Sequence, residues 1–204
     1  MVLIIGITGA TGVIYGIRLL EVLSRVKGVE THLIISDAAE ENIKYETNWK
    51  VEDINALANF HYDVNDTGAC LASGSFKSAG MIIAPCTIKT MSALANSYSD
   101  TLLTRAGDVT LKERRKLVLL VRETPFHIGH LRNMERLSEM GAIIMPPVPA
   151  FYHKPKTIQD IIDHTIGKTL DIFGIEHNLF QRWSGPQVGK RGEGNGKGKS
   201  SQIS

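Results

Sequence analysis

The chain has 204 residues, 43% of them hydrophobic, and a formal net charge of +2. This length suits one domain with a full core and is short for two. Residues 185–204 hold four Lys and Arg against one Glu, so the rest of the chain is nearly neutral and shows no nucleic-acid-binding charge pattern. No apolar run approaches the roughly 20 residues of a membrane span, no secretory signal opens the chain, and two cysteines are too few for a disulfide framework. We therefore expect a cytoplasmic protein.

A glycine-rich turn follows the first predicted strand, residues 2–7. It contains Gly6, Gly9 and Gly12, spaced three apart, and a helical pattern follows over residues 13–26. Because glycine has no Cβ, backbone N–H groups and the positive end of a helix can approach an anion closely here. The turn predicts a phosphate-bearing cofactor, with a tight strand-to-helix turn without a ligand as the alternative.

The remaining elements alternate between short apolar runs and helical patterns. We predict further strands at residues 31–35, 81–84, 117–121 and 142–145, and helices at 37–46, 88–96, 101–115, 127–140 and 158–173. Such alternation is typical of a doubly wound α/β fold: a parallel sheet in the middle of three layers. We expect a single domain over residues 1–184 and a disordered Gly/Lys-rich tail over residues 185–204.

The predicted strands end in polar residues, which is where ligands bind in such sheets. The second strand ends at Ser36, where dinucleotide-binding proteins often carry an acid. The third is followed by P-C-T-I-K-T, residues 85–90, whose hydroxyls either cap the next helix or, with Lys89, form a second anion or flavin contact. Cys86 within it is expected to be a buried structural thiol.

Arg122 and Glu123 follow the fourth strand. They form either a structural ion pair or a functional pair in which Arg122 holds a phosphate and Glu123 transfers protons. Arg105 and Lys112 lie seven residues apart on the preceding helix, so they share one side and could face a phosphate together.

Two other patterns are expected to be misleading. His127 and His130 share a helix start, but they are too few for a zinc site, and we predict no metal. Tyr152 and Lys156 form the Y-x-x-x-K of short-chain dehydrogenases, which requires a helix. Pro155 and the prolines before it place this segment in a loop, where the tyrosine is better suited to bind a substrate oxyanion.

Together these segments resemble the flavin prenyltransferases of the UbiX type. The resemblance covers residues 2–184 and rests on the motifs G-I-T-G-A-T-G-V-I-Y-G, E-T-H-L-I-I-S, A-S-G-S-F, A-P-C-T-I-K-T, L-L-T-R-A-G-D-V-T-L-K-E-R-R-K-L-V-L-L-V-R-E-T-P, M-P-P-V-P-A-F-Y-H-K-P and F-Q-R-W. It implies a flavodoxin-like subunit of a homododecamer, with FMN between subunits. Such enzymes join the dimethylallyl group of dimethylallyl phosphate to N5 and C6 of reduced FMN, without metal. The product serves a UbiD-type decarboxylase, in ubiquinone synthesis or in aromatic acid decarboxylation.

The resemblance also implies roles for individual residues. The flavin would be held by Gly9, Ala10, Thr11, Ser36, Thr87, Ile88, Lys89, Thr90 and Arg122. Dimethylallyl phosphate would be held by Tyr152 and Lys168, helped by Arg105 and Lys112. Glu123 is the first candidate for proton handling and Glu46 a weaker one, and Trp183 could stabilise an allyl cation.

Departures from the family pattern are small. Thr11 replaces a common Ser, Gly107 an Ala, and Lys168 an Arg found in some relatives. Three alternatives remain: a flavin-dependent cysteine decarboxylase, which P-C-T-I-K-T disfavours, a non-catalytic decarboxylase subunit, and a flavodoxin-like electron carrier.

Overall fold

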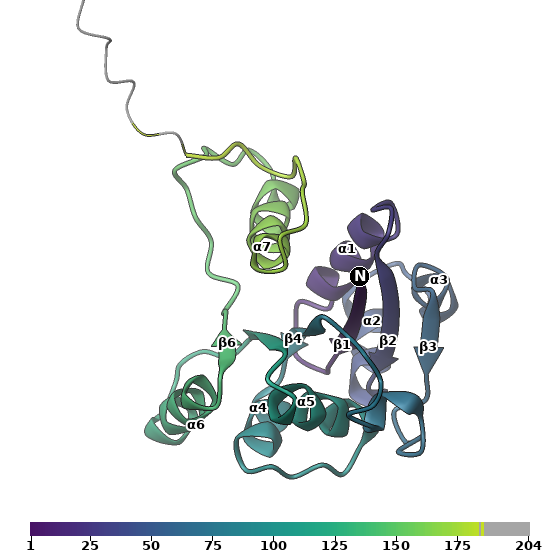
Figure 1. The fold of residues 1–204 in the computed structure, drawn as a ribbon. Coiled ribbons are helices and arrows are strands. Elements are labelled where there is room, and N and C mark those ends of the chain that lie inside the picture. Colours follow the sequence, from purple (N-terminus) through teal and green to yellow (C-terminus); the bar gives the residue numbers. More distant parts are fainter. Residues whose placement is uncertain (184, 186–204) are drawn as a thin grey trace, which may run out of the picture.

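Six parallel strands form the central sheet of the computed structural model, which describes residues 1–183 and residue 185 (Figure 1). The strands are β1 (Val2–Ile7), β2 (Glu30–Ile35), β3 (Phe60–Tyr62), β4 (Gly80–Cys86), β5 (Lys116–Val121) and β6 (Ala142–Ile144). Their order is β3-β2-β1-β4-β5-β6, and all neighbours are parallel. This arrangement confirms the predicted doubly wound sheet.

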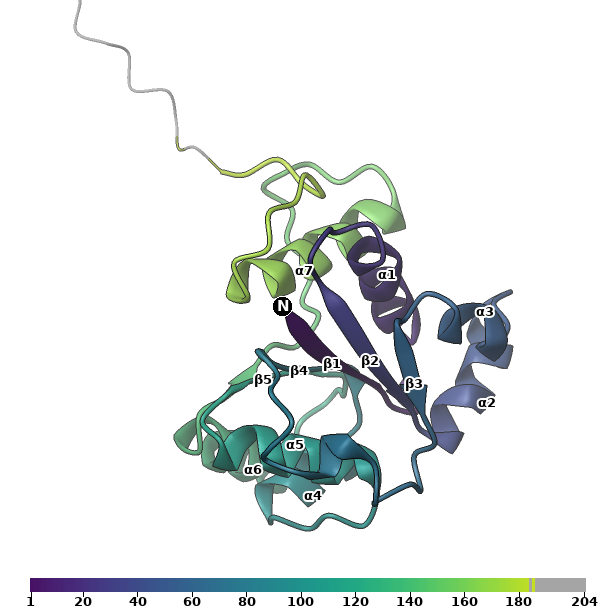
Figure 2. The same ribbon diagram turned by 45° about the vertical axis from the view of Figure 1, so that its right-hand side comes forward.

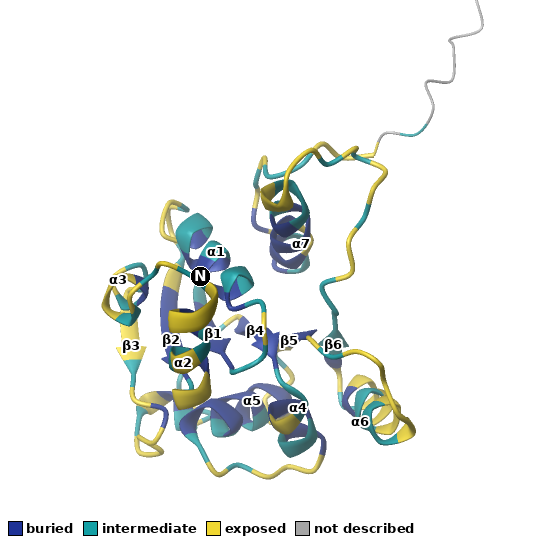
Figure 3. Cartoon of the chain, turned by 180° about the vertical axis from the view of Figure 1, so that it is seen from behind, coloured by how far each residue is buried: buried dark blue, intermediate teal, exposed yellow. Residues whose placement is uncertain are grey.

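Helices cover both faces of the sheet and complete the three predicted layers (Figure 2). One face carries α1 (Ile14–Leu23), α2 (Asp37–Glu46), α3 (Val51–Asn55) and α7 (Ile158–Ile172), and the other carries α4 (Ile88–Ala95), α5 (Leu102–Lys112) and α6 (Ile128–Glu139). Alternation within β1 feeds the two cores, because Leu3 and Ile5 face the α1 side while Ile4 faces the α5 side. Figure 3 shows the buried inner sides of α5 and α7 and the exposed outer side of α6.

Hydroxyl side chains begin several of the helices. Ser36 caps α2 and Thr87 caps α4, and capping boxes at Thr101 and Thr157 begin α5 and α7. The helix predicted to reach residue 115 ends at Lys112, since Arg114 takes a left-handed backbone conformation with φ of 56°.

Two short elements are absent from the predictions. Strand β3 is an edge strand of three residues, largely exposed, so it lacks the apolar run of a buried strand. Helix α3 has five residues, too few to show a helical period. In the part of the chain that the structure describes, no helix is long and apolar enough to cross a membrane. The predicted disordered tail lies outside the described residues, apart from Gly185.

Candidate functional site

A cavity of about 740 Å³ lies at the carboxyl ends of the strands where the strand order reverses, between β1 and β4. Segments that follow four strands line it, together with the loop before α5 and the start of α5. The lining includes Thr8, Gly9, Ser36, Ala38, Val64, Asn65, Thr87, Lys89, Thr90, Tyr98, Asp100, Thr101 and Thr104. The predicted location of the site at the strand ends is therefore matched by a cavity of ligand size.

Thr8 joins the ends of β1 and β4. Its hydroxyl donates to the Pro85 carbonyl at 2.8 Å and accepts from the Thr87 N–H at 2.9 Å. Next to it, a Cβ on Gly9 would lie 2.5 Å from the Cβ of Ala38. Only glycine therefore fits where the turn meets the first turn of α2.

The turn offers fewer free donors than its sequence suggests. The Glu46 carboxylate accepts from the N–H groups of Gly12, at 2.7 Å, and Val13, at 3.3 Å. The N-terminus of α1 is therefore bonded within the chain, and it is Thr8 and Gly9 that face the cavity. Ala10 and Thr11 lie beside the lining without being part of it.

Hydroxyl groups at two helix starts face the cavity. The Ser36 oxygen accepts from the Ala39 N–H at 3.2 Å, and the Thr87 oxygen accepts from the Thr90 N–H at 3.1 Å. The capping interpretation of Thr87 is thus confirmed. Ser36 keeps its proton for a ligand, since only its oxygen is used in the cap. The exposed Lys89 adds a cation, so the cavity suits an anionic, hydrogen-bonding ligand.

Cys86 is fully buried, as expected, and its thiol lies 3.6 Å from the Thr87 carbonyl. Burial raises the pKa of this thiol far above its ordinary value. The group therefore stays protonated and is not a nucleophile.

Part of the cavity was missed by sequence reasoning. Val64 and Asn65 follow the unpredicted strand β3, and Tyr98 and Asp100 lie in the loop between α4 and α5. The one available signal was the turn after β3, in which the Asn65 N–H donates to the Asp63 carboxylate at 2.8 Å.

Arg122 and Glu123 follow β5 at the same edge of the sheet. The Arg122 N–H donates to the Cys86 carbonyl at 3.1 Å, which joins the ends of β4 and β5. The Glu123 carboxylate accepts from the Thr124 N–H at 2.8 Å. Among the described residues Arg122 and Glu123 form no ion pair with each other, so the structural ion-pair interpretation is wrong. Arg122 and Ile88 are not part of the cavity lining.

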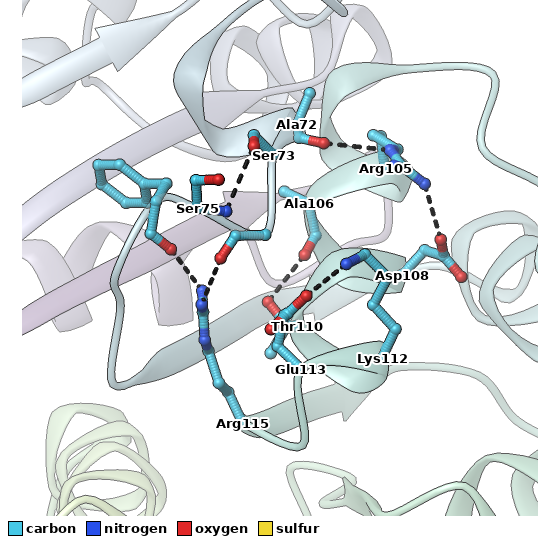
Figure 4. Close-up of polar contacts among 12 residues, drawn as sticks. Ala72, Ser73, Ser75, Arg105, Ala106, Asp108, Thr110, Lys112, Glu113 and Arg115 are labelled. Carbon is cyan, nitrogen blue, oxygen red and sulfur yellow. Dashed lines mark hydrogen bonds and ion pairs between the residues drawn. The ribbon is translucent and has the colours of Figure 1, made fainter.

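Arg105 and Lys112 do share one side of α5, as predicted (Figure 4). Arg105 donates to the Ala72 carbonyl at 3.2 Å and pairs with Asp108 at 3.0 Å. Lys112 pairs with Glu113, and its ammonium nitrogen would lie 2.8 Å from a Cβ on Gly74. Both cations therefore border the segment Ala72–Gly74 on the outside of the α5 layer.

Tyr152, Lys168 and Trp183 belong to a third group, located on and beside α7. The Tyr152 hydroxyl lies 2.7 Å from Nε2 of His164, and its ring lies 6.2 Å from that of Trp183. Residues 152–156 form no helix, which confirms that the dehydrogenase pattern is misleading. None of these three residues lines the cavity, and α7 covers the sheet face opposite to α4 and α5.

The paired histidines lie elsewhere. His127 caps α6 by accepting from the Gly129 N–H at 3.0 Å, and its ring lies 3.6 Å from that of His130. Within residues 1–183, no group of three or more His, Cys, Asp or Glu is arranged to hold a metal ion.

Comparison with known proteins places this geometry in context. The family described as "Flavoprotein" matches residues 1–179. A protein of Thauera aromatica named "Flavin prenyltransferase UbiX" is 57% identical over 185 residues, which are 91% of this chain and 95% of that protein.

Two solved structures are similar over nearly the whole subunit, each with a TM-score of 0.89. A dodecameric FMN-dependent UbiX-like decarboxylase from Escherichia coli O157:H7 is 47% identical and covers 91% of this chain and 100% of its own. AnUbiX (PadA1) in complex with FMN and dimethylallyl pyrophosphate is 46% identical and covers 91% of this chain and 98% of its own.

Proposed function

The chain belongs to the UbiX-type flavin prenyltransferases of the flavoprotein family, and on that premise we propose that it joins the dimethylallyl group of dimethylallyl phosphate to N5 and C6 of reduced FMN. The prenylated FMN would serve a UbiD-type decarboxylase, in ubiquinone synthesis or in aromatic acid decarboxylation. The related structure with FMN and dimethylallyl pyrophosphate supports FMN and a phosphate ester of the dimethylallyl group as the two substrates. We also propose a cytoplasmic location, which fits the two free cysteines.

The observation that carries the proposal is the cavity at the β1/β4 switch point. Its volume of about 740 Å³ and its mixture of apolar and hydrogen-bonding groups suit a flavin nucleotide. Gly9, Ser36, Thr87, Lys89 and Thr90 would hold the FMN there. The packing of Gly9 against Ala38 supports this assignment, since a side chain at position 9 would clash with Ala38 beside the cavity.

The phosphate of the second substrate needs cations and hydroxyl donors. Tyr152 and Lys168 would supply them, with help from Arg105 and Lys112. Tyr152 and Lys168 lie on the far face of the sheet from α4 and α5, so we propose that they complete the cavity of a neighbouring copy. The dodecameric state of the related Escherichia coli protein supports a shared site.

Reduced FMN would supply the nucleophilic N5 and C6 atoms. The new bond to N5 would replace the allylic C–O bond, whose electron pair leaves with the phosphate while N5 loses its proton, so positive charge develops on carbon and negative charge on the phosphate. The bond to C6 would form as the double bond of the transferred group takes up a proton and C6 loses its own. Lys168 and the Tyr152 hydroxyl would stabilise the phosphate, and the exposed Trp183 ring the allyl cation. Glu123 would hold or transfer a proton at the leaving phosphate oxygen.

The test is anaerobic incubation of the protein with FMN, a reductant and dimethylallyl phosphate, followed by mass spectrometry of the released flavin. We expect the flavin to gain one prenyl unit. Glu123→Gln should lower the rate about 100-fold or more, the range for a lost acid–base group. Glu135→Gln, at an exposed position of α6, is the matched control. Unmodified FMN recovered from folded, flavin-loaded protein would contradict the proposal.

A further inference from the structure

His164 is a buried histidine bonded to a half-exposed tyrosine. It lies in α7 with 7% of its surface exposed, whereas Tyr152 is 47% exposed. The Tyr152 hydroxyl lies 2.7 Å from His164 Nε2, a distance typical of a strong hydrogen bond. A hydroxyl on the surface is thus attached to a group fixed in the interior.

Neighbouring rings fix the direction of the His164 imidazole. The His153 ring stacks on it, with centroids 4.7 Å apart and planes 5° apart, and the Phe180 ring lies 4.6 Å away. His153 comes from the loop before α7 and Phe180 from the C-terminal segment. Because these two rings hold the imidazole, its Nε2 atom points toward the Tyr152 hydroxyl. The hydroxyl of Tyr152 is thereby oriented before any ligand binds.

The direction of the hydrogen bond decides what Tyr152 offers a ligand. A tyrosine hydroxyl has one proton, and a phosphate oxygen accepts hydrogen bonds but does not donate them. When the N–H of His164 donates to Tyr152, the tyrosine proton is left for the phosphate. When His164 accepts instead, the hydroxyl presents only lone pairs to the anion.

Charged neighbours of His164 bear on this choice. Burial, followed by the nearby His153 and Lys168, lowers the pKa of His164, so the ring is neutral near pH 7 and either nitrogen can carry the proton. The titratable groups that face it are Tyr152 and His153 from the loop and Lys168 from its own helix. The C-terminal segment presents Phe180, and the Arg182 guanidinium lies 5.6 Å from the centroid of that ring.

We infer that His164 is a positioning residue for the transfer reaction: its Nε2–H donates to the Tyr152 hydroxyl and directs the tyrosine proton at the phosphate of dimethylallyl phosphate. This inference rests on the proposed function, because it takes Tyr152 as a ligand of that phosphate. His164 itself touches neither substrate.

A double-mutant cycle tests the inference. His164→Leu should raise the KM for dimethylallyl phosphate about three- to tenfold, the value of one hydrogen bond, and leave FMN affinity unchanged. In a Tyr152→Phe background the same change should have no further effect, because the hydroxyl it acts through is gone. His164→Gln, whose amide retains a donor, should restore most of the affinity. His61→Leu, at an exposed histidine of β3, controls for loss of an imidazole.

Two further readouts separate positioning from simple support of the fold. Quenching of Trp183 fluorescence by dimethylallyl phosphate, without FMN, measures binding independently of turnover. As the pH falls from about 6.5 to 5, the affinity of the wild type for dimethylallyl phosphate should rise relative to that of His164→Gln, since only the imidazole gains charge.

Three results would overturn the inference. They are effects of His164→Leu and Tyr152→Phe that multiply in the double mutant, an unchanged KM in His164→Leu, and pH profiles of the wild type and His164→Gln that run parallel. If His164→Leu does not fold, the comparison of wild type with His164→Gln decides. A wild-type protein that binds dimethylallyl phosphate but leaves FMN unmodified would contradict the proposed function instead. In that case the double-mutant cycle could still be measured from the affinities of the variants for dimethylallyl phosphate.

Discussion

Gly9 is the residue at which the backbone comes closest to α2. A Cβ there would lie 2.5 Å from the Ala38 Cβ and 2.9 Å from its carbonyl carbon, and a backbone contact cannot be relieved by rotating a side chain. We expect Gly9→Ala to lower FMN affinity at least tenfold and to destabilise the fold by about 1–3 kcal/mol, the usual cost of overpacking. Flavin titration and urea denaturation measure the two effects.

Gly68→Ala is the matched control for Gly9→Ala. Gly68 is an exposed loop glycine, and the nearest atom to its Cβ, an Asp66 carboxylate oxygen, would be 3.4 Å away. This variant should keep both flavin affinity and stability. Equal behaviour of the two variants would show that the contact with Ala38 does not limit position 9.

Cys86 makes stability depend on pH. Its pKa is raised in the folded protein by burial, so the thiol stays protonated there, whereas in the unfolded chain it ionises above about pH 8.5. The unfolded state then binds fewer protons, and the free energy of unfolding should fall as pH rises, by up to about 1.4 kcal/mol per pH unit. Urea denaturation at several pH values between about 8 and 10 measures this slope.

Cys86→Ala should remove this pH dependence, and Cys70→Ala should retain it, because Cys70 is exposed whereas Cys86 is buried. A wild-type slope that survives in Cys86→Ala would assign the effect to other groups.

Among the elements, the predictions succeeded where burial leaves a clear apolar pattern. Strands β1, β2, β4 and β5 are buried along most of their length and read as continuous apolar runs. The turn at Gly9 and the cap Thr87 depend on local chemistry, so they too could be read from the sequence.

Parts of the site that depend on long-range contacts could not be predicted. Asn65 reaches the cavity through β3, whose three largely exposed aromatic residues are held as a strand by pairing with β2. The bonding of Glu46 to the N–H groups of Gly12 and Val13 joins residues more than 30 positions apart, and no spacing rule predicts it. The same holds for the bond between Tyr152 and His164, since the loop conformation decides it.

One carboxylate of α7 bonds two residues of the C-terminal segment. Asp171 accepts from Arg182 at 2.6 Å and lies 3.1 Å from His177 Nε2, and the Arg182 bond is the main reason that the Asp171 pKa is lowered. We expect Asp171→Asn to speed hydrogen exchange in residues 176–183. It should also weaken dimethylallyl phosphate binding, because Trp183 is the residue directly after Arg182, which Asp171 holds. Glu176→Gln, an exposed acid of the same segment, is the control.

The pH dependence of this contact follows from the lowered pKa. The stabilisation is present above the unfolded-state pKa of about 4 and is lost as pH falls through the lower folded-state value. Wild-type exchange in this segment should therefore rise toward that of Asp171→Asn in acid. Unchanged exchange in Asp171→Asn at neutral pH would contradict the role of this carboxylate.

For the whole molecule, the distribution of site residues is the main feature. The cavity opens at the strand ends near α4 and α5, while Tyr152, Lys168 and Trp183 are grouped around α7 on the other face of the sheet. Sequence motifs indicated the residues of both groups, but the sequence pattern of one chain does not predict that the two groups lie on different sides of the sheet. The proposed site therefore requires two copies, one giving the cavity and the other the phosphate ligands.

Mixed assembly tests this arrangement most directly. One subunit carries Lys89→Glu, which places a negative charge in the cavity, and the other carries Tyr152→Phe with Lys168→Ala. All three positions are exposed, so both subunits should fold. The two are coexpressed with different tags, purified as mixed oligomers and assayed for prenylated FMN by mass spectrometry. If each site takes its cavity and its phosphate ligands from different copies, random assembly should restore about a quarter of the wild-type activity, although each parent alone is inactive. Mixed oligomers as inactive as their parents would show that each site draws both groups from one chain, and would contradict the account.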